Sequence, residues 1–358
     1  MLASELTVTS TIGNYNTDIG VPCSIFGRTI PRRISNPFAW GVIFLRNELA
    51  LLFGSGAEAL VLELGTDTPG EIASFAWLKP HVAVVTAVAP EHMEFFKTIE
   101  AVAQEELAVA DYSARVVVNG RMIDERFLAG IDMDTLTKYD RADIAGYDLT
   151  PKDLRVVGAH SIDSIAAALA VGDALELSNQ GMVTAAREVL PKPGRMSELK
   201  GINSSRLIDD TYNSSPEAVI AALDYIYTQK APQKIALLGN MNEFGDASRD
   251  AHIAIGEYCD PDKLDLVVTL GPDANAYTAP AARAHGCTVE ETNTPYEAGE
   301  LIKRHMKEGV LVLLKGSQNK VFAEEATKIL LADPSDERRL VRQSIDWLEK
   351  KQRNFNEA

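Results

Sequence analysis

Short apolar runs of about strand length recur along this chain without polar alternation. Such runs are typical of parallel strands that helices cover on both faces. The clearest ones are residues 59–62, 82–85, 116–118, 235–238, 266–268 and 310–314. Segments with helical periodicity lie between them, at residues 99–110, 161–175, 216–227, 250–258 and 294–307. This alternation predicts an α/β fold with parallel sheets.

A proline-rich break divides the pattern at residues 190–194, Leu-Pro-Lys-Pro-Gly. Two prolines and a glycine end the preceding helix and are typical of a connector between domains. We therefore predict an N-terminal α/β domain over residues 1–190 and a Rossmann-like α/β domain over residues 191–336. Residues 337–358 are expected to form a charged helical tail.

The chain has 358 residues, enough for roughly two domains, and a formal net charge of −16. This charge argues against a nucleic-acid partner, because neutralising a phosphate backbone needs a basic patch. It does not exclude a nucleotide, which a few local cations and helix N-termini can bind.

Cysteine usage and hydropathy bear on the compartment. The cysteines at positions 23, 259 and 287 are far apart and follow no metal-binding spacing, so we expect unpaired thiols in a reducing compartment. Residues 38–53 are strongly apolar, but Arg46, Asn47 and Glu48 leave flanking runs too short to span a bilayer. We predict a buried or surface-lying helix there. The protein is expected to be cytoplasmic and monomeric, with no secretory signal and no stable membrane insertion.

The most polar turn is at residues 209–216, Asp-Asp-Thr-Tyr-Asn-Ser-Ser-Pro, directly after the apolar pair Leu207 and Ile208. Pro216 suits the first turn of a helix, and acidic side chains are favoured near the positive helix end. A strand, a polar turn and a helix start form a common ligand-binding unit in α/β domains. The alternative is a capped turn on the surface.

Further polar residues follow other predicted strands. Glu63 ends one strand beside Gly65, where a carboxylate suits a hard cation, although a solvated acid is the alternative. Thr86 ends the next strand, and its loop leads to His92. Because Glu63 and His92 lie at the same predicted sheet edge, we expect them to share Mg²⁺ or Mn²⁺.

Two basic turns can contact anions. Lys315, Gly316 and Ser317 follow a strand, and such a turn either holds a phosphate or is a simple connection. Arg195 follows Gly194 just after the connector and can present its guanidinium to a phosphate or carboxylate. Another glycine-bounded polar turn spans residues 239–245.

These turns, together and in this order, resemble the Mur ligase family, which uses ATP to join amino acids or peptides to a peptidoglycan precursor. The resemblance is to the members that add D-alanyl-D-alanine. It extends from about residue 10 to 332 and rests on residues 14–22, 63–72, 86–96, 209–216, 239–245 and 315–317. The asparagine stretch at 14–22 and the Asp-Asp turn are specific, whereas the Lys-Gly-Ser turn alone is weak.

The resemblance implies a mechanism and its participants. ATP would phosphorylate the terminal carboxylate of UDP-MurNAc-tripeptide, and the amine of D-Ala-D-Ala would attack the acyl phosphate. Glu63 and His92 would hold Mg²⁺, and Lys315 would reach phosphate as the domains close. The nucleotide contacts implied are Arg195, Asp210, Tyr212, Asn213, His160, Ser161 and Ser164. The substrate contacts implied are Asn14, Asn16 and Thr86.

The sequence also departs from the family pattern. It contains no G-x-x-x-x-G-K-S/T phosphate loop, so we expect a central domain truncated at its N-terminus and a chain nearly inactive by itself. Glu106 stands where the family has a carbamylated lysine that helps bind metal. It either supplies a similar carboxylate as a catalytic and metal residue or marks a decayed site. Ser161 and Ser164 replace asparagines, and Gln318 replaces an arginine.

Three interpretations remain open at this point. The chain is an N-terminally truncated product of an ATP-dependent ligase, which is the interpretation we favour. Alternatively, it is a short paralogue that binds a nucleotide or a partner without ligation. The third is a sister amide ligase such as folylpolyglutamate synthase, which the asparagine stretch and the Asp-Asp turn disfavour.

Overall fold

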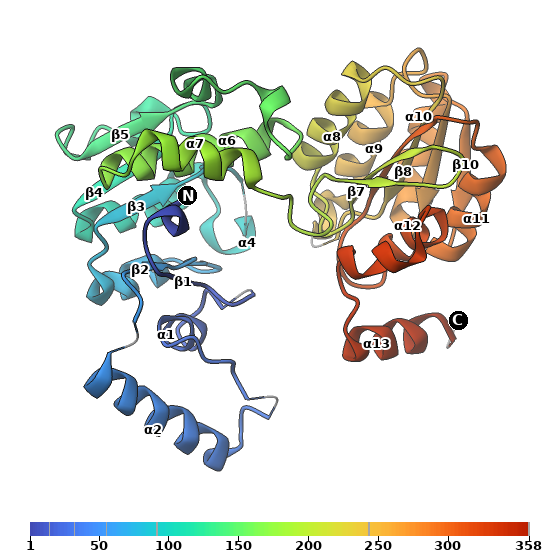
Figure 1. Ribbon diagram of the computed structural model, residues 1–358. Helices are drawn as coiled ribbons and strands as arrows, with labels where there is room; N and C mark the ends of the chain where they lie inside the picture. Colours follow the sequence, from blue (N-terminus) through green and yellow to red (C-terminus); the bar gives the residue numbers. More distant parts are fainter. Residues whose placement is uncertain (14, 32, 55, 91, 243, 357–358) are drawn as a thin grey trace. The chain divides into compact units, whose positions relative to one another are not determined.

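The computed structural model describes the whole chain except residues 14, 32, 55, 91, 243 and 357–358 (Figure 1). It contains two compact units. The first consists of Met1–Leu154 and Ile162–Val189, and the second of Arg155–Ser161 and Leu190–Ala358. Both units mix helices with parallel sheet, which confirms the predicted α/β class.

The first unit contains two small parallel sheets. One consists of β3 (Val82–Val85), β4 (Arg115–Asn119) and β5 (Leu136–Tyr139), and the other pairs β1 (Val8–Ser10) with β2 (Ala59–Val61). Strand residues Val85, Val116 and Val118 pack with Ile72 and Leu107 in one buried cluster. The apolar runs therefore form strands because their side chains supply this core.

The first unit also contains helices and helical turns. Residues 38–53 form α2 (Pro37–Phe53), whose cap residue Asn36 accepts hydrogen bonds from the amides of Phe38 and Ala39. The helix lies on the surface. The other helices and helical turns of this region are η1 (Leu2–Ser4), α1 (Gly20–Ile25), α3 (Glu71–Ser74), η2 (Phe75–Leu78), α4 (Met93–Phe96), α5 (Ile99–Leu107), η3 (Ala108–Tyr112), η4 (Glu125–Phe127), η5 (Arg141–Tyr147), η6 (Pro151–Asp153), α6 (Ala159–Ala174) and α7 (Asn179–Glu188).

The second unit is built on one sheet in the order β10-β9-β8-β11-β7-β6. Its strands are β6 (Ser197–Lys200), β7 (Arg206–Asp210), β8 (Lys234–Gly239), β9 (Leu266–Leu270), β10 (Val289–Thr292) and β11 (Leu311–Lys315). All pairs are parallel except β6 with β7. In this register Lys315 is opposite both Asp210 and Leu238, so the ends of β7, β11 and β8 meet at one edge.

Helices cover both faces of this sheet. Ile208 packs with α8 (Pro216–Thr228), α9 (Ser248–Tyr258) and α10 (Ala279–Ala284), whereas Leu207 packs with α11 (Pro295–His305) and α12 (Glu324–Leu330). Adjacent strand residues thus face opposite buried layers, which explains the lack of polar alternation. The remaining elements are η7 (Gly245–Ala247), η8 (Ala274–Thr278), η9 (Pro334–Arg339) and α13 (Ile345–Asn356).

Candidate active site

A buried ion pair joins the turns after β7 and β11. Lys315 Nζ lies 2.7 Å from Asp210 Oδ2 and donates to the carbonyl of Asn213 at 3.0 Å. The other carboxylate oxygen of Asp210 accepts from the amide of Met196 at 3.1 Å. Lys315 thus holds the polar turn in place. Contact with a phosphate, as the resemblance implied, would require these bonds to be exchanged, and that role stays a prediction.

Asp209 connects the same turn to the domain connector. Its Oδ2 accepts from the amide of Gly194 at 3.1 Å, and its Oδ1 accepts from the hydroxyl of Thr211 at 2.7 Å. The side chain is fully buried, and this burial, with the nearby Glu324 and Asp210 carboxylates, raises the pKa of Asp209 to about 7. The two consecutive aspartates therefore serve to fix residues 194–196 against β7.

Arg195 and Tyr212 form an accessible face on this framework. The guanidinium carbon of Arg195 lies 4.3 Å from the centre of the Tyr212 ring. Gly194 allows this approach, because it has φ of +68° and a Cβ there would lie 2.9 Å from the Tyr212 amide. Arg195 is exposed, so its planar donors remain available beside an aromatic surface.

Polar contacts extend this edge to a third turn. Ser317 donates its hydroxyl to Asn213 Oδ1 at 2.8 Å and its amide to the carbonyl of Asn240 at 3.1 Å. Asn242 donates to the carbonyls of Gln318 and Asn319. Within the described residues, the buried Ser214 hydroxyl has no hydrogen-bond partner, which is uncommon in a protein interior.

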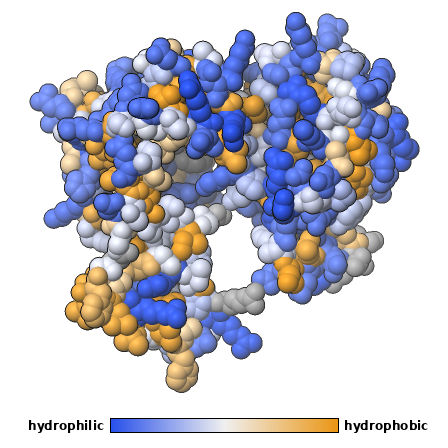
Figure 2. Space-filling model, viewed as in Figure 1, coloured by the Kyte–Doolittle hydropathy of each residue, from blue (hydrophilic) through white to orange (hydrophobic). Residues whose placement is uncertain are grey.

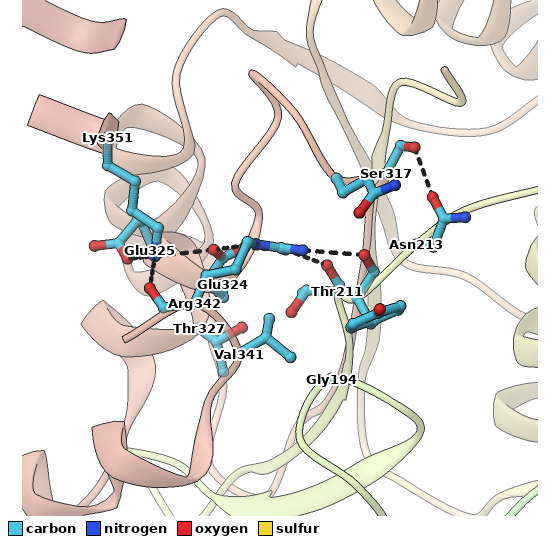
Figure 3. Close-up of polar contacts among 12 residues, drawn as sticks. Gly194, Thr211, Asn213, Ser317, Glu324, Glu325, Thr327, Val341, Arg342 and Lys351 are labelled. Atoms are coloured by element: carbon cyan, nitrogen blue, oxygen red, sulfur yellow. Dashed lines mark hydrogen bonds and ion pairs between the residues drawn. The ribbon is translucent and has the colours of Figure 1, made fainter. Parts of the chain in front are cut away.

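A charge network from the C-terminal segment contacts the backbone of the turn that follows β7 (Figure 3). Arg342 lies between Glu324 and the backbone, 2.6 Å from Glu324 Oε2, and donates to the carbonyls of Thr211 and Tyr212. Lys351 contacts Glu324 at 2.9 Å and Glu325 at 2.6 Å. Burial opposes ionisation of Glu325, but Lys351 and Lys328 hold its pKa below the usual value.

The sequence did not identify this network, because residues 337–358 were expected to be a charged tail. Lys351 is only 2% exposed. It lies on helix α13, which spans Ile345–Asn356 and so forms only part of the predicted tail. A charged side chain is seldom buried without a partner, and only the fold reveals the partners.

The predicted metal ligands of the first unit are not gathered into one cluster. Glu63 is exposed after β2, Thr86 is exposed after β3, and Glu106 is half-buried on α5. His92 Nε2 lies 3.4 Å from Asp67 Oδ1. Among the residues that the structure describes, no three His, Cys, Asp or Glu side chains are close enough to hold a metal ion. The Mg²⁺ site stays a prediction.

Glu105, the neighbour of Glu106, has a role that the sequence did not suggest. Its Oε1 accepts from the amide of Ile72 at 2.7 Å, and its Oε2 accepts from the amide of Gly70 at 2.6 Å. It therefore anchors the turn that follows Glu63. The available signal was its spacing from Val102, three residues earlier on the buried face of α5.

The remaining predicted residues are spread over both units. Asn16 contacts the Glu63 turn, because its carbonyl accepts from the amide of Gly65 at 2.9 Å. Asn14 lies outside the described residues. His160 and Ser161 are near the start of α6 within the second unit, and Ser164 follows on the part of α6 that belongs to the first.

Across the described ranges, the structure has no helix long and apolar enough to cross a bilayer.

Comparison with known proteins gives family matches in both units. Residues 1–126 match the Mur ligase middle domain, and residues 194–318 match the Mur ligase glutamate ligase domain. The UDP-N-acetylmuramoyl-tripeptide–D-alanyl-D-alanine ligase of Bacillus subtilis is 24% identical over 356 residues, covering 93% of this chain and 72% of the relative. The enzyme of the same name from Synechocystis is 24% identical, covering 92% and 70%.

The fold is similar to that of a solved structure. The MurF ligase from Thermotoga maritima in complex with ADP has a TM-score of 0.68 and 21% identity, covering 94% of this chain and 75% of that one. At this identity the match shows the fold alone.

Proposed function

The chain belongs to the Mur ligase family, and we propose that it forms an amide bond with ATP, adding D-alanyl-D-alanine to UDP-MurNAc-tripeptide. The observation that carries the proposal is the meeting of the turns after β7, β11 and β8 at one sheet edge, with Arg195 stacked on Tyr212. Relatives named for this reaction match over more than nine tenths of the chain.

The reaction consists of two transfers. A carboxylate oxygen of the tripeptide attacks the γ-phosphorus of ATP, forming an acyl phosphate and releasing ADP. The amine of D-Ala-D-Ala then attacks the acyl carbon, phosphate leaves, and the amine loses a proton. Such chemistry depends mainly on positioning and on stabilising charge at the phosphates.

The second unit would bind the nucleotide. Arg195 offers paired N–H donors that match phosphate oxygens, and the Tyr212 ring offers a flat face for a base or ribose. Asp209, Asp210 and Lys315 would keep these groups in place.

The first unit would bind the acceptor substrate, with Asn16 and Thr86 as contacts. We keep Mg²⁺ at Glu63 and His92 as part of the proposal, with Glu106 as a further ligand. Because the three side chains are not gathered among the described residues, we derive no step through the metal. We also infer a cytoplasmic location, since Cys23, Cys259 and Cys287 are unpaired buried thiols.

Hydroxylamine trapping tests the proposal directly. With ATP and UDP-MurNAc-tripeptide, but without D-Ala-D-Ala, the protein should release ADP and convert the substrate carboxylate to a hydroxamate. Nucleotide binding without ADP or hydroxamate would instead favour a paralogue that binds without ligation. Arg195→Ala should weaken ATP binding about tenfold or more, as loss of charged hydrogen bonds predicts. Arg338→Ala, at another exposed arginine of the same unit, is the control.

A further inference from the structure

Helix α2 (Pro37–Phe53) leaves most of its apolar side chains in solvent. All 17 of its residues are described, and none is buried. Phe38, Leu52 and Phe53 are 86%, 76% and 83% exposed. Hydrophobic side chains gather over this helix at the lower left of the space-filling view (Figure 2). Single exposed apolar residues are ordinary, but a contiguous set of this size marks an interaction surface.

The most exposed face of α2 is a regular stripe. Residues 38, 42, 45, 49 and 52 follow each other at intervals of four and three, so they lie along one side of the helix. The opposite side contacts the segment that precedes the helix. Arg28 Nε donates to Asn47 Oδ1 at 3.4 Å, and Trp40 Nε1 donates to the carbonyl of Ile34 at 2.7 Å. The stripe therefore lies on the side away from these contacts, and its residues are exposed.

The surroundings of the stripe are basic in an otherwise acidic protein. Residues 26–54 contain four arginines and one acid, a net charge of +3, in a chain whose total is −16. Arg33 and Arg46 are exposed. Arg28 donates to neutral oxygens of Asn47 and Arg46, so these contacts leave its charge uncompensated.

We propose that α2 docks the protein on an anionic lipid bilayer. The helix lies in the plane of the surface, its apolar stripe enters the headgroup–acyl boundary, and Arg28, Arg33 and Arg46 contact lipid phosphates. Charge complementarity favours this occupant over a second copy of the chain, because self-pairing would bring two positively charged segments together. No residue of this surface is among the proposed nucleotide and substrate residues.

Vesicle co-sedimentation of the full chain tests the proposal. Binding to vesicles that contain phosphatidylglycerol should exceed binding to phosphatidylcholine vesicles and should weaken with added salt. Leu52→Glu should weaken binding about tenfold or more, because it removes apolar burial. Arg33→Glu and Arg46→Glu should each weaken it about fivefold or more, since each replaces an attractive charge with a repulsive one.

Matched controls come from other exposed positions. Met133→Glu, at a side chain 66% exposed in the first unit, and Arg304→Glu on α11 should bind vesicles like the unchanged protein. Circular dichroism verifies that the variants fold. Absence of vesicle binding, or equal and salt-independent binding to both vesicle types, overturns the proposal. A lipid-independent dimer that Leu52→Glu dissociates in sedimentation velocity also overturns it and assigns the stripe to a second copy.

Discussion

Lys315 Nζ and Asp210 Oδ2 lie 2.7 Å apart, and the two side chains are only 2% and 10% exposed. They are neighbours in the register of β11 and β7, so the sheet itself brings them together. Burying either charge alone would be costly, and the pair removes most of that cost while fixing the polar turn. Lys315 is therefore a structural residue of the site, whatever contact it makes with a ligand.

Lys315→Met should lower the free energy of unfolding by about 3–5 kcal/mol, because it leaves the Asp210 carboxylate buried without its cation. Urea denaturation measures this change. The control is Arg206→Ala, whose partner Glu198 is 40% exposed and whose loss should cost less than about 1 kcal/mol. Similar losses in the two variants would contradict the structural role of Lys315.

Asp209 should make stability depend on pH. Since burial raises its pKa to about 7, the native protein retains a proton that the unfolded chain releases near pH 4. The contribution of Asp209 to the free energy of unfolding should therefore fall as pH rises from about 4 to 7 and stay constant outside that window. Asp209→Asn should remove this part of the pH dependence in urea unfolding, whereas Asp262→Asn, at an exposed site, should not. Parallel pH profiles for Asp209→Asn and the unchanged protein would refute the assignment.

Glu105→Ala should destabilise the first unit, because it leaves the amides of Gly70 and Ile72 without their acceptor. We expect a loss of about 2–4 kcal/mol in thermal or urea unfolding. Glu100→Ala on the same helix removes an exposed pair with Arg126 and should cost less than about 1 kcal/mol. An equal effect of both changes would mean that Glu105 does not anchor the turn.

The predicted metal ligands can be separated by mutation. Glu63→Ala should abolish the dependence of ADP release on Mg²⁺, because it removes one of the proposed metal ligands. Glu106→Lys should change the metal concentration required, since the family has a carbamylated lysine there. The readout is ADP release over a range of Mg²⁺ and Mn²⁺ concentrations. An unchanged metal response in both variants would refute this site.

The sequence predicted the apolar strands better than the polar ones. β8, β9 and β11 are mostly apolar because helices cover both of their faces, and such runs are visible without a structure. β5, β6 and β10 lie at sheet edges and carry polar residues, so no apolar run indicated them.

The sequence predicted which turns form the site, but not which side chains contact one another there. Residues 209–213 and 315–317 were each expected to follow a strand, and the register of β7 and β11 brings both turns to one edge of the sheet. The internal pairing of Lys315 and the burial of Lys351 depend on which distant segments pack together, and the local sequence does not contain that information. The anchoring role of Glu105 was not predicted for a similar reason, because the sequence alone did not show which side of α5 is buried.

Mass spectrometry of the reaction product tests the central claim most directly. The protein, in excess over UDP-MurNAc-tripeptide, is incubated with ATP and with either D-Ala-D-Ala or single amino acids. We predict that the mass of UDP-MurNAc-pentapeptide appears only with D-Ala-D-Ala, at a rate below the roughly 1 s⁻¹ lower limit typical of enzymes, since the sequence has no G-x-x-x-x-G-K-S/T loop. A product with a single amino acid, or no product from protein that binds ATP, would contradict the account.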